Sequence, residues 1–371
     1  MRSLVRSAGR VAGGVLGTAM TAAAVAAVVH HNRIATVRRL ATRLLDDLPA
    51  VLPPDREYLV MADDGVELSV EELDPADGKA PEFTVVLIHG YTLDRRSWLF
   101  QRHDLAQCTA PRVRQVLYDH RGHGRSGRSP RQACTIEQLG RDLSAVIRAA
   151  APEGRVVLIG HSLGGMTIMA LAERNPELFA EQICGVAFLN TSAGDIGRSG
   201  LPKPILSRRN PMLPVAALLS RWGPSARALD RGRDICGNLI WSLTRKLSFA
   251  DEEVNPALVE LIYRMTRATS SEVMTDFLAT FGAHNRYAAL AGLQYTKALV
   301  LGSDSDRLIQ YEHCEAIAAL LPDVELVRVR GSGHVTMLEA PKLVNEHLRD
   351  LLSRCAGAHC AVTPARRENG A

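Results

Sequence analysis

The sequence predicts an α/β fold, in which a mostly parallel sheet is flanked by helices and a helical cap is inserted between two strands. Short apolar runs without alternation recur along the chain, and such runs are typical of parallel strands that are covered on both faces. Helix-like segments separate these runs, so that strands and helices alternate. The alternation stops only in a long interval, residues 195–292, which has the pattern of helices and loops.

The predicted strands begin with a hairpin. Two alternating runs, Glu57–Met61 and Val66–Glu71, meet at Asp63-Asp64-Gly65, a pattern typical of an antiparallel turn. The later predicted strands are apolar, as expected inside a sheet; they are Phe83–His89, Val113–Tyr118, Val156–Ile159, Gly185–Asn190, Ala298–Leu301 and Glu325–Val329. Thr135 to Gln138 has capping-box spacing and opens a predicted helix that ends near Ala150. The other helices are expected at about Ser97–Cys108, Leu163–Arg174, Glu312–Leu320 and Pro341–Ser353.

The interruption of the alternating pattern predicts how the chain is divided. An insertion between two strands of an open α/β sheet is expected to cover the carboxyl ends of the strands, where such sheets bind ligands. We therefore expect a basic arm over residues 1–45, which holds a candidate membrane-spanning helix, and a sheet core over 46–195 and 293–354. A helical cap is expected over 196–292 and a disordered tail over 355–371.

The net charge of +4 is unevenly placed. Residues 1–45 contain seven arginines and no acidic residue, so residues 46–371 carry a net charge of −3. A basic arm on a slightly acidic body does not indicate a nucleic-acid partner and fits an anionic membrane surface better. The seven cysteines include no C-x-x-C pair, which argues against a zinc site or a disulfide framework and favours buried, reduced thiols.

The basic arm contains one uncharged stretch, Val11–Val29, with arginines on both sides. Its length just suffices to cross a bilayer as a helix, although seven alanines and three glycines make it only marginally apolar. A single-pass anchor, a cleaved signal peptide with a site near Ala24–Ala26 and an alanine-rich helix packed on the body are competing interpretations. We expect membrane association through this single helix, on an undetermined side, with a cytoplasmic location as the alternative.

The stretch GHSLGG, Gly160–Gly165, carries the first chemical signal. A G-x-S-x-G pattern between a strand and a helix is typical of a nucleophilic serine. The sharp turn strains the backbone of Ser162, so Gly160 and Gly164 must lack side chains that would collide. The hydroxyl then stands at a helix start, where N–H groups face a developing anion. Ser162 is the predicted nucleophile.

A serine nucleophile needs a base, and the chain order Ser, Asp or Glu, His is expected in a sheet of this kind. Of the twelve histidines, His334 is the first to follow the last predicted strand, and it lies downstream of an acid. His89 and His161 lie inside tight turns next to the motifs, and we expect their side chains to point away from the site. His334 is therefore the predicted base.

The orienting acid should follow the predicted strand Ala298–Leu301. The next loop offers Asp304 and Asp306, of which one can orient the base while the other supports its own loop. Asp195 is a third candidate, for which a turn role is the stronger interpretation. The residues alone leave the choice between Asp304 and Asp306 open.

Two backbone N–H groups are expected to hold an oxyanion. One is that of Leu163, directly after the nucleophile, and the other that of Tyr91 in the loop HGYT, where Gly90 lets the backbone approach a substrate. A second polar loop, Asp119–Ser126, reads DHRGHGRS but lacks both phosphate-loop patterns. We expect this loop to be a hydrogen-bonded scaffold beside the site.

Together these motifs resemble the α/β-hydrolase superfamily, from about Glu57 to Ser353. HGYT (89–92), DHRGHGRS (119–126), GHSLGG (160–165), the SDSDRL acid loop and GSGHVTMLEAP (331–341) occur in the order of that family. Within it the chain is similar to actinobacterial-type lipases, esterases and lysophospholipase-like serine hydrolases. In those relatives the acid directly precedes an arginine-like position, so the resemblance places it at Asp306 and leaves Asp304 in reserve. Haloalkane dehalogenases and epoxide hydrolases have an aspartate in place of Ser162, which argues against their chemistry.

The expected activity is hydrolysis of carboxylic esters through an acyl-enzyme, without a metal or an organic cofactor. Residues 196–292 hold 13 Lys and Arg against 8 Asp and Glu, together with apolar and aromatic runs. This composition favours lipid-like esters, acylglycerols or lysophospholipids with an anionic head group, over generic small esters. C–C bond hydrolysis, cofactor-free oxygenase or haloperoxidase-type activity and a non-catalytic binding protein of hydrolase descent are the alternatives. The oligomeric state is not indicated by the sequence.

Overall fold

An eight-stranded sheet forms the centre of the computed structural model, which describes residues 32–196, 236–250 and 253–357. The strand order is β1-β2-β4-β3-β5-β6-β7-β8. The strands are β1 (Arg56–Met61), β2 (Glu67–Leu73), β3 (Phe83–Ile88), β4 (Val113–Tyr118), β5 (Val156–His161), β6 (Ile183–Leu189), β7 (Lys297–Ser303) and β8 (Val324–Val329). Only β2 pairs antiparallel, with β1 and β4, and all other neighbours are parallel. The predicted fold class, a mostly parallel sheet that opens with a hairpin, is confirmed.

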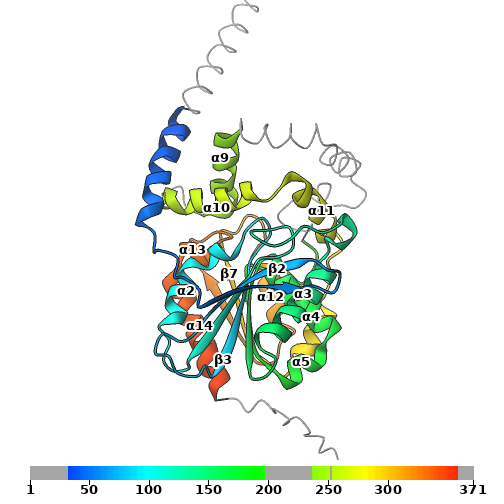
Figure 1. Cartoon of the computed structure of the whole chain (residues 1–371). Coiled ribbons are helices and arrows are strands. Elements are labelled where there is room, and N and C mark those ends of the chain that lie inside the picture. The colour runs from blue at the N-terminus through cyan, green and yellow to red at the C-terminus, as the bar shows by residue number, and fades with distance from the viewer. Residues whose placement is uncertain (1–31, 197–235, 251–252, 358–371) are drawn as a thin grey trace, which may run out of the picture.

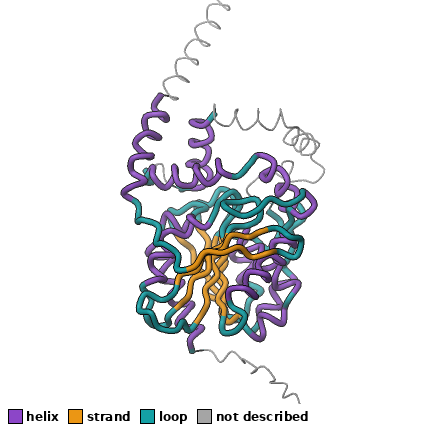
Figure 2. The backbone as a smooth tube through the Cα atoms, in the orientation of Figure 1, coloured by secondary structure: helices purple, strands orange, loops and turns teal. Residues whose placement is uncertain are grey.

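Helices cover both faces of the sheet, as Figure 2 shows. Their apolar side chains pack on the strands in two clusters, so that successive residues of a central strand enter opposite clusters: Val86 and Ile88 one, Val85 and Leu87 the other. The first cluster holds α3 (Ile136–Ala150), α4 (Leu163–Arg174), α5 (Pro176–Glu181) and α12 (Glu312–Ala318), and the second α2 (Leu99–Ala106), α13 (Thr336–Glu339) and α14 (Pro341–Ala356). Burial on both faces explains why these strands read as continuous apolar runs.

The strand order reverses between β3 and β5, and this reversal positions the site. From β3 the chain first adds β4 on one side and then β5 to β8 on the other. The pairing of Ile88 with Gly160 brings the loops after β3 and β5 side by side at the carboxyl ends of the strands. A crevice at such a switch point is where open α/β sheets bind ligands. The HGYT and GHSLGG motifs therefore meet at one edge of the sheet.

Three further helices lie above this edge in Figure 1, between β6 and β7 in the chain. We call them the cap helices: α9 (Gly237–Ser248), α10 (Pro256–Ala268) and α11 (Ser271–Phe281). The described residues also form short helical turns: η1 (Leu45–Asp47), η2 (Arg95–Trp98), η3 (Arg131–Ala133) and η4 (Ala288–Leu293). Much of the predicted cap, residues 197–235 and 251–252, lies outside the described residues, and the domain division stays a prediction.

The described part of the basic arm packs against the cap helices. Residues 32–44 are helical, and Arg38 of this helix donates to Asn238 of α9 at 2.7 Å and stacks 4.4 Å above the ring of Tyr263 of α10. Within the described residues, the longest and most apolar helices still fall short of what a membrane crossing needs. The predicted location at a membrane through a single N-terminal helix is corrected on this finding; the stretch predicted to cross, residues 11–29, lies outside the described residues.

The chain end differs from the prediction in one detail. Helix α14 runs to Ala356 and buries Cys355 completely, so its apolar face continues past the predicted boundary between residues 354 and 355. Residues 358–371 of the predicted tail lie outside the described part.

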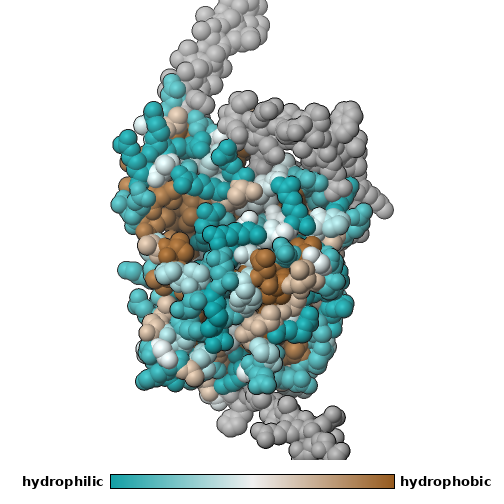
Figure 3. Space-filling view, viewed as in Figure 1, coloured by the Kyte–Doolittle hydropathy of each residue, from teal (hydrophilic) through white to brown (hydrophobic). Residues whose placement is uncertain are grey.

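Like Cys355, the residues Cys134, Cys184 and Cys314 are buried as free thiols. The face shown in Figure 3 is largely hydrophilic with separate apolar patches.

Candidate active site

Ser162 sits in a sharp turn between β5 and α4, with φ of 51° and ψ of −114°. This region of backbone space is costly for a residue with a side chain. The turn closes because two neighbours are glycines: a Cβ on Gly164 would lie 2.1 Å from the carbonyl oxygen of Ile88, and one on Gly160 would lie 2.5 Å from the carbonyl carbon of Gly164. The sequence predicted this requirement.

His334 and Asp306 come together at the neighbouring strand ends. Asp306 follows β7 and His334 follows β8, and the Nδ1 atom of His334 lies 2.8 Å from Oδ2 of Asp306. Because a carboxylate only accepts hydrogen bonds, Nδ1 is the donor, which leaves the lone pair of a neutral imidazole on Nε2. That nitrogen is the one available to a substrate or to Ser162.

Four donors surround the carboxylate of Asp306. Its Oδ1 accepts from the backbone N–H groups of Leu308 and Ile309 at 2.8 and 2.9 Å, and its Oδ2 accepts from His334 and from the Asn190 side chain at 3.0 Å. Burial acts to raise the pKa of Asp306, but His334 and these hydrogen bonds hold that pKa below its ordinary value. The group is therefore an anion at neutral pH.

Asn190 is a site residue that the sequence did not reveal. It follows β6 with a positive φ of 47° and also contacts Ser303 at 2.7 Å. The stretch NTSAGD offers an acid, Asp195, as its candidate, while the amide at its start belongs to no recognised motif. One sequence feature could have indicated Asn190: it is a polar residue directly after a predicted strand, and the candidate acids follow the next strand along the chain.

The other candidate acids lie away from His334. Asp304 is exposed, and its Oδ1 accepts from the N–H of Gly331 at 2.9 Å, which ties together the loops after β7 and β8. Asp195 has a positive φ of 57° in the segment that leads toward the cap helices. Of the three acids considered, the structure brings only Asp306 to the imidazole.

The two residues predicted to supply oxyanion donors directly follow Gly90 and Ser162, which lie close together: a Cβ on Gly90 would lie 3.3 Å from the Ser162 Cβ. Leu163 opens α4, and the first N–H groups of a helix have no partner within it. Tyr91 lies in the adjacent loop, where its hydroxyl donates to the carbonyl of Met274 in α11 at 2.5 Å. The HGYT loop is thus fastened to a cap helix.

The DHRGHGRS loop holds the HGYT loop from the other side, as the sequence predicted for a scaffold. The backbone N–H of His120 donates to Nε2 of His89 at 2.9 Å, and Nε2 of His120 donates to the carbonyl of His89 at 3.0 Å. Arg121 is fully buried and paired with Asp142 of α3 and Asp64 of the hairpin. These contacts fix the loop that carries Tyr91.

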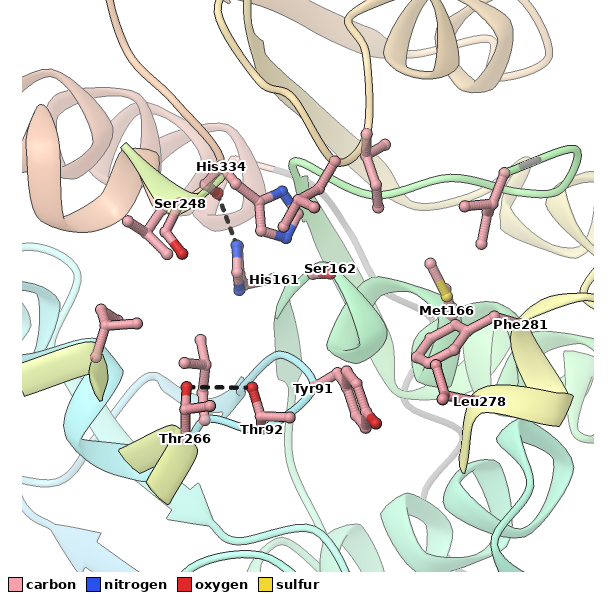
Figure 4. A pocket seen from close by; sticks show the side chains of 16 residues that line it. Tyr91, Thr92, His161, Ser162, Met166, Ser248, Thr266, Leu278, Phe281 and His334 are labelled. Atoms are coloured by element: carbon pink, nitrogen blue, oxygen red, sulfur yellow. Dashed lines mark hydrogen bonds between the residues drawn. The ribbon is translucent and has the colours of Figure 1, made fainter. Parts of the chain in front are cut away.

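A cavity of about 160 Å³ opens above Ser162. Figure 4 shows Ser162, His161 and His334 at its centre, with Met166, Leu278 and Phe281 on one side and Ser248 on the other. An apolar cavity of about 150 Å³ can hold a benzene molecule, so the enclosed space suits about six carbon atoms. The lining residues are Tyr91, Thr92, Leu93, His161, Ser162, Met166, Ile196, Ser248, Ile262, Thr266, Leu278, Phe281, Leu308, Ile309, His334 and Val335.

Comparison with known proteins places this site in a family. The family model of the α/β-hydrolase fold matches residues 84–341. The chain belongs to the α/β-hydrolase family. It is 42% identical over 244 residues to the "Putative carbamate hydrolase RutD" of Azorhizobium caulinodans, an alignment that covers 65% of this chain and 82% of that protein.

Solved structures of other α/β hydrolases share the fold. A thermophilic esterase from Thermogutta terrifontis has a TM-score of 0.63 at 23% identity, and the alignment covers 81% of this chain and 99% of the esterase chain. The enol-lactonase from Burkholderia xenovorans LB400 has a TM-score of 0.62 at 22% identity, and the alignment covers 80% of this chain and 100% of the enol-lactonase chain. At these identities the likeness concerns the fold alone.

His161 of this α/β hydrolase lines the cavity, so the prediction that its side chain points away from the site is wrong. Its Nε2 donates to the backbone carbonyl of His334 at 2.9 Å, and the two rings lie 4.9 Å apart. Burial and the neighbouring His334 lower the pKa of His161 to about 3. A neutral imidazole thus supports the His334 backbone through a contact that spans 173 residues, which no local pattern marks.

Among the described residues, the cavity lining holds no Asp, Glu, Lys or Arg side chain. Arg264 and Arg286, two of the cations in the described part of the cap segment, are paired with acids: Arg264 with Glu260, and Arg286 with Glu137 and Glu173. The expectation that the basic surplus of residues 196–292 receives an anionic head group stays a prediction, because residues 197–235 and 251–252 lie outside the described part. Desolvating an unpaired anion here would be costly.

Buried histidines should make the stability of this hydrolase depend on pH. Burial lowers the pKa of His89, His123 and His284 to about 4 and that of His161 to about 3. The unfolded chain binds protons below its ordinary histidine pKa of about 6.5, while the folded chain does not until about pH 4. The free energy of unfolding should therefore fall between pH 6.5 and 4, by about 1.4 kcal/mol per pH unit for each such histidine.

Urea denaturation at about pH 7.5, 6.5 and 5.5 measures this loss. The variant His123→Asn, whose amide can replace the Nδ1 donor to the Arg121 carbonyl, should show a shallower pH dependence than the wild type. The matched control His103→Asn, at a partly exposed position in α2, should keep the wild-type slope. A free energy of unfolding that is constant from pH 7.5 to 5.5 would contradict the assignment of these imidazoles as neutral.

Proposed function

We propose that this α/β hydrolase cleaves uncharged carboxylic esters, with Ser162 as nucleophile, His334 as base and Asp306 as the orienting acid. The hydrogen bond between His334 and Asp306, at the edge of the cavity that also exposes Ser162, carries the proposal. It supports a nucleophile, a base and a fixed acid in the arrangement that acyl transfer needs. Family membership and esterases among the structural neighbours agree with it.

The reaction would proceed in two steps. As the Ser162 Oγ attacks the ester carbonyl, its proton moves to Nε2 of His334, and the N–H groups of Tyr91 and Leu163 hold the oxyanion. The C–O bond then breaks, and His334 returns the proton to the leaving alcohol. In the second step His334 takes a proton from water, whose oxygen attacks the acyl-enzyme. The bond between the acyl carbon and the Ser162 Oγ then breaks, His334 returns the proton to that Oγ, and the acid is released. Asp306 stabilises the imidazolium in both steps.

The apolar side of the cavity supports a preference for an acyl group longer than acetyl. Each buried CH₂ contributes about 0.8 kcal/mol, or roughly a fourfold gain per carbon. With p-nitrophenyl esters, kcat/KM should rise by about fourfold for each added carbon from acetate to butanoate. A preference confined to acetate would contradict a substrate with a lipid-like acyl chain.

The same panel tests the reaction class. A p-nitrophenyl carbamate should be cleaved more slowly than the ester of similar size, because the apolar side of the cavity is adapted to a hydrocarbon acyl group. The relative named for carbamate hydrolysis makes the opposite result a real alternative. Faster cleavage of the carbamate, or no cleavage of any ester, would overturn the proposed activity.

A further inference from the structure

We propose that the alcohol released at this site is a small, uncharged, hydroxylated alcohol of the glycerol type, bound by the hydroxyl groups of Ser248, Thr92 and Thr266. This inference rests on the proposed ester hydrolysis at Ser162 and adds the leaving group that the site selects. The two sides of the cavity differ in chemistry, and the position of the base decides which side receives the alcohol.

The alcohol must lie on the His334 side. When the bond between the acyl carbon and the alcohol oxygen breaks, that oxygen takes its proton from Nε2 of His334, so the two atoms are within hydrogen-bond reach. Ser248 lies on this side, because its carbonyl accepts from the N–H of Val335 at 3.2 Å. Figure 4 shows the Ser248 side chain next to His334 and His161.

The acyl group then occupies the opposite side. In Figure 4, Met166, Leu278 and Phe281 lie beyond Ser162, away from Ser248. Met166 is one turn after the nucleophile in α4, and the other two project from α11. Thioether, aliphatic and aromatic groups offer no hydrogen bond of ordinary strength to a hydroxyl, so this side favours the hydrocarbon part of an ester.

Hydroxyl groups gather on the leaving-group side. Thr92 of the HGYT loop and Thr266 of α10 face each other with their Oγ1 atoms 3.4 Å apart. This distance exceeds the usual 2.5–3.0 Å for O–H···O contacts, so the contact between the two threonines is weak. Each hydroxyl oxygen has two acceptor lone pairs and can still accept a hydrogen bond from a substrate. Within the described residues, the Ser248 hydroxyl makes no hydrogen bond.

The arrangement of Thr92 is imposed by the loop. Its φ is 60°, in the left-handed region, which β-branched residues rarely adopt. Leu93, Ile262 and Val335 complete the lining near these hydroxyls. In the described lining, apolar walls with a few placed hydroxyls and no Lys or Arg side chain fit a neutral alcohol whose hydroxyls can both donate and accept. A phosphorylated alcohol would leave its charge unpaired there.

Two esters with the same acyl group test the inference on the wild-type enzyme. Glyceryl monobutanoate and propyl butanoate differ only in the hydroxyls of the alcohol. We expect a kcat/KM at least about fivefold higher for the glyceryl ester, since one hydrogen bond between neutral groups contributes roughly a 2- to 12-fold effect. Butanoyl glycerol phosphate should be a poorer substrate than either. Equal rates, or a preference for propyl butanoate or the phosphorylated ester, would overturn the proposal.

Variants assign the preference to the named hydroxyls. Ser248→Ala and Thr266→Val should each lower the ratio of the two kcat/KM values by about 2- to 12-fold. The control Thr275→Val removes a hydroxyl of α11 that bonds within its own helix, to the Ser271 carbonyl, and should keep the wild-type ratio. Unchanged ratios in both test variants would exclude these hydroxyls as the recognition groups. Absence of turnover of both esters by the wild type would instead contradict the proposed function itself.

Discussion

Replacing the proposed nucleophile should nearly abolish activity: Ser162→Ala is expected to lower kcat on p-nitrophenyl butanoate by about 10⁴- to 10⁶-fold. The alanine removes the only atom that can form the acyl-enzyme, while the strained turn, the cavity and the oxyanion donors remain. The residual rate would come from binding and oxyanion stabilisation. Thermal unfolding should be nearly unchanged, because alanine meets the same positive φ that Ser162 already tolerates.

Covalent labelling tests the same residue without a substrate. A fluorophosphonate should label the wild type and leave Ser162→Ala unlabelled, while Ser353→Ala, a serine near the end of α14 whose hydroxyl bonds within its own helix, should label like the wild type. Equal labelling of all three proteins, or of none, would remove the basis for a serine nucleophile. Loss of labelling together with retained ester hydrolysis would point to direct attack by water.

Much of this site could be predicted because it depends on short-range rules. Gly160 and Gly164 mark the nucleophile turn since any larger residue would collide with backbone atoms at 2.5 and 2.1 Å. The apolar runs mark the strands because both faces of the sheet are covered. The carboxyl ends of parallel strands lie at the same edge of the sheet. The polar residues that come after Ile88 in β3, Gly160 in β5 and Ser303 in β7 therefore had to meet at this edge.

The parts that escaped prediction are contacts between distant segments. His161 lines the cavity because its ring reaches the carbonyl of His334, and Asn190 holds Asp306 across two strand ends. The interaction of Tyr91 with Met274 likewise joins a core loop to α11. No spacing within the sequence records such pairs. Composition likewise does not tell which cations of the cap segment reach the cavity, and residues 197–235 of that segment lie outside the described part.

The sequence also left two acids for one role, and the structure turns that choice into a measurement. Asp306→Asn is expected to lower kcat by about 10⁴-fold. The N–H groups of Leu308 and Ile309 both donate to Oδ1, so the asparagine oxygen is held at that end. Its NH₂ group must then face Nδ1 of His334, which can only accept from it. The imidazole is forced to carry its proton on Nε2 and can no longer take one from Ser162.

Asp304→Asn is the matched control, because the substitution is chemically identical two residues away. Asp304 is exposed, and its hydrogen bond from the Gly331 N–H needs only an oxygen, which the amide retains. Its kcat should stay within about threefold of the wild type, as for other surface substitutions. A larger loss in Asp304→Asn than in Asp306→Asn would transfer the role of orienting acid to Asp304. Near-normal rates in both variants would show that His334 keeps its productive tautomer without either carboxylate, leaving Asn190 and the loop backbone to position it.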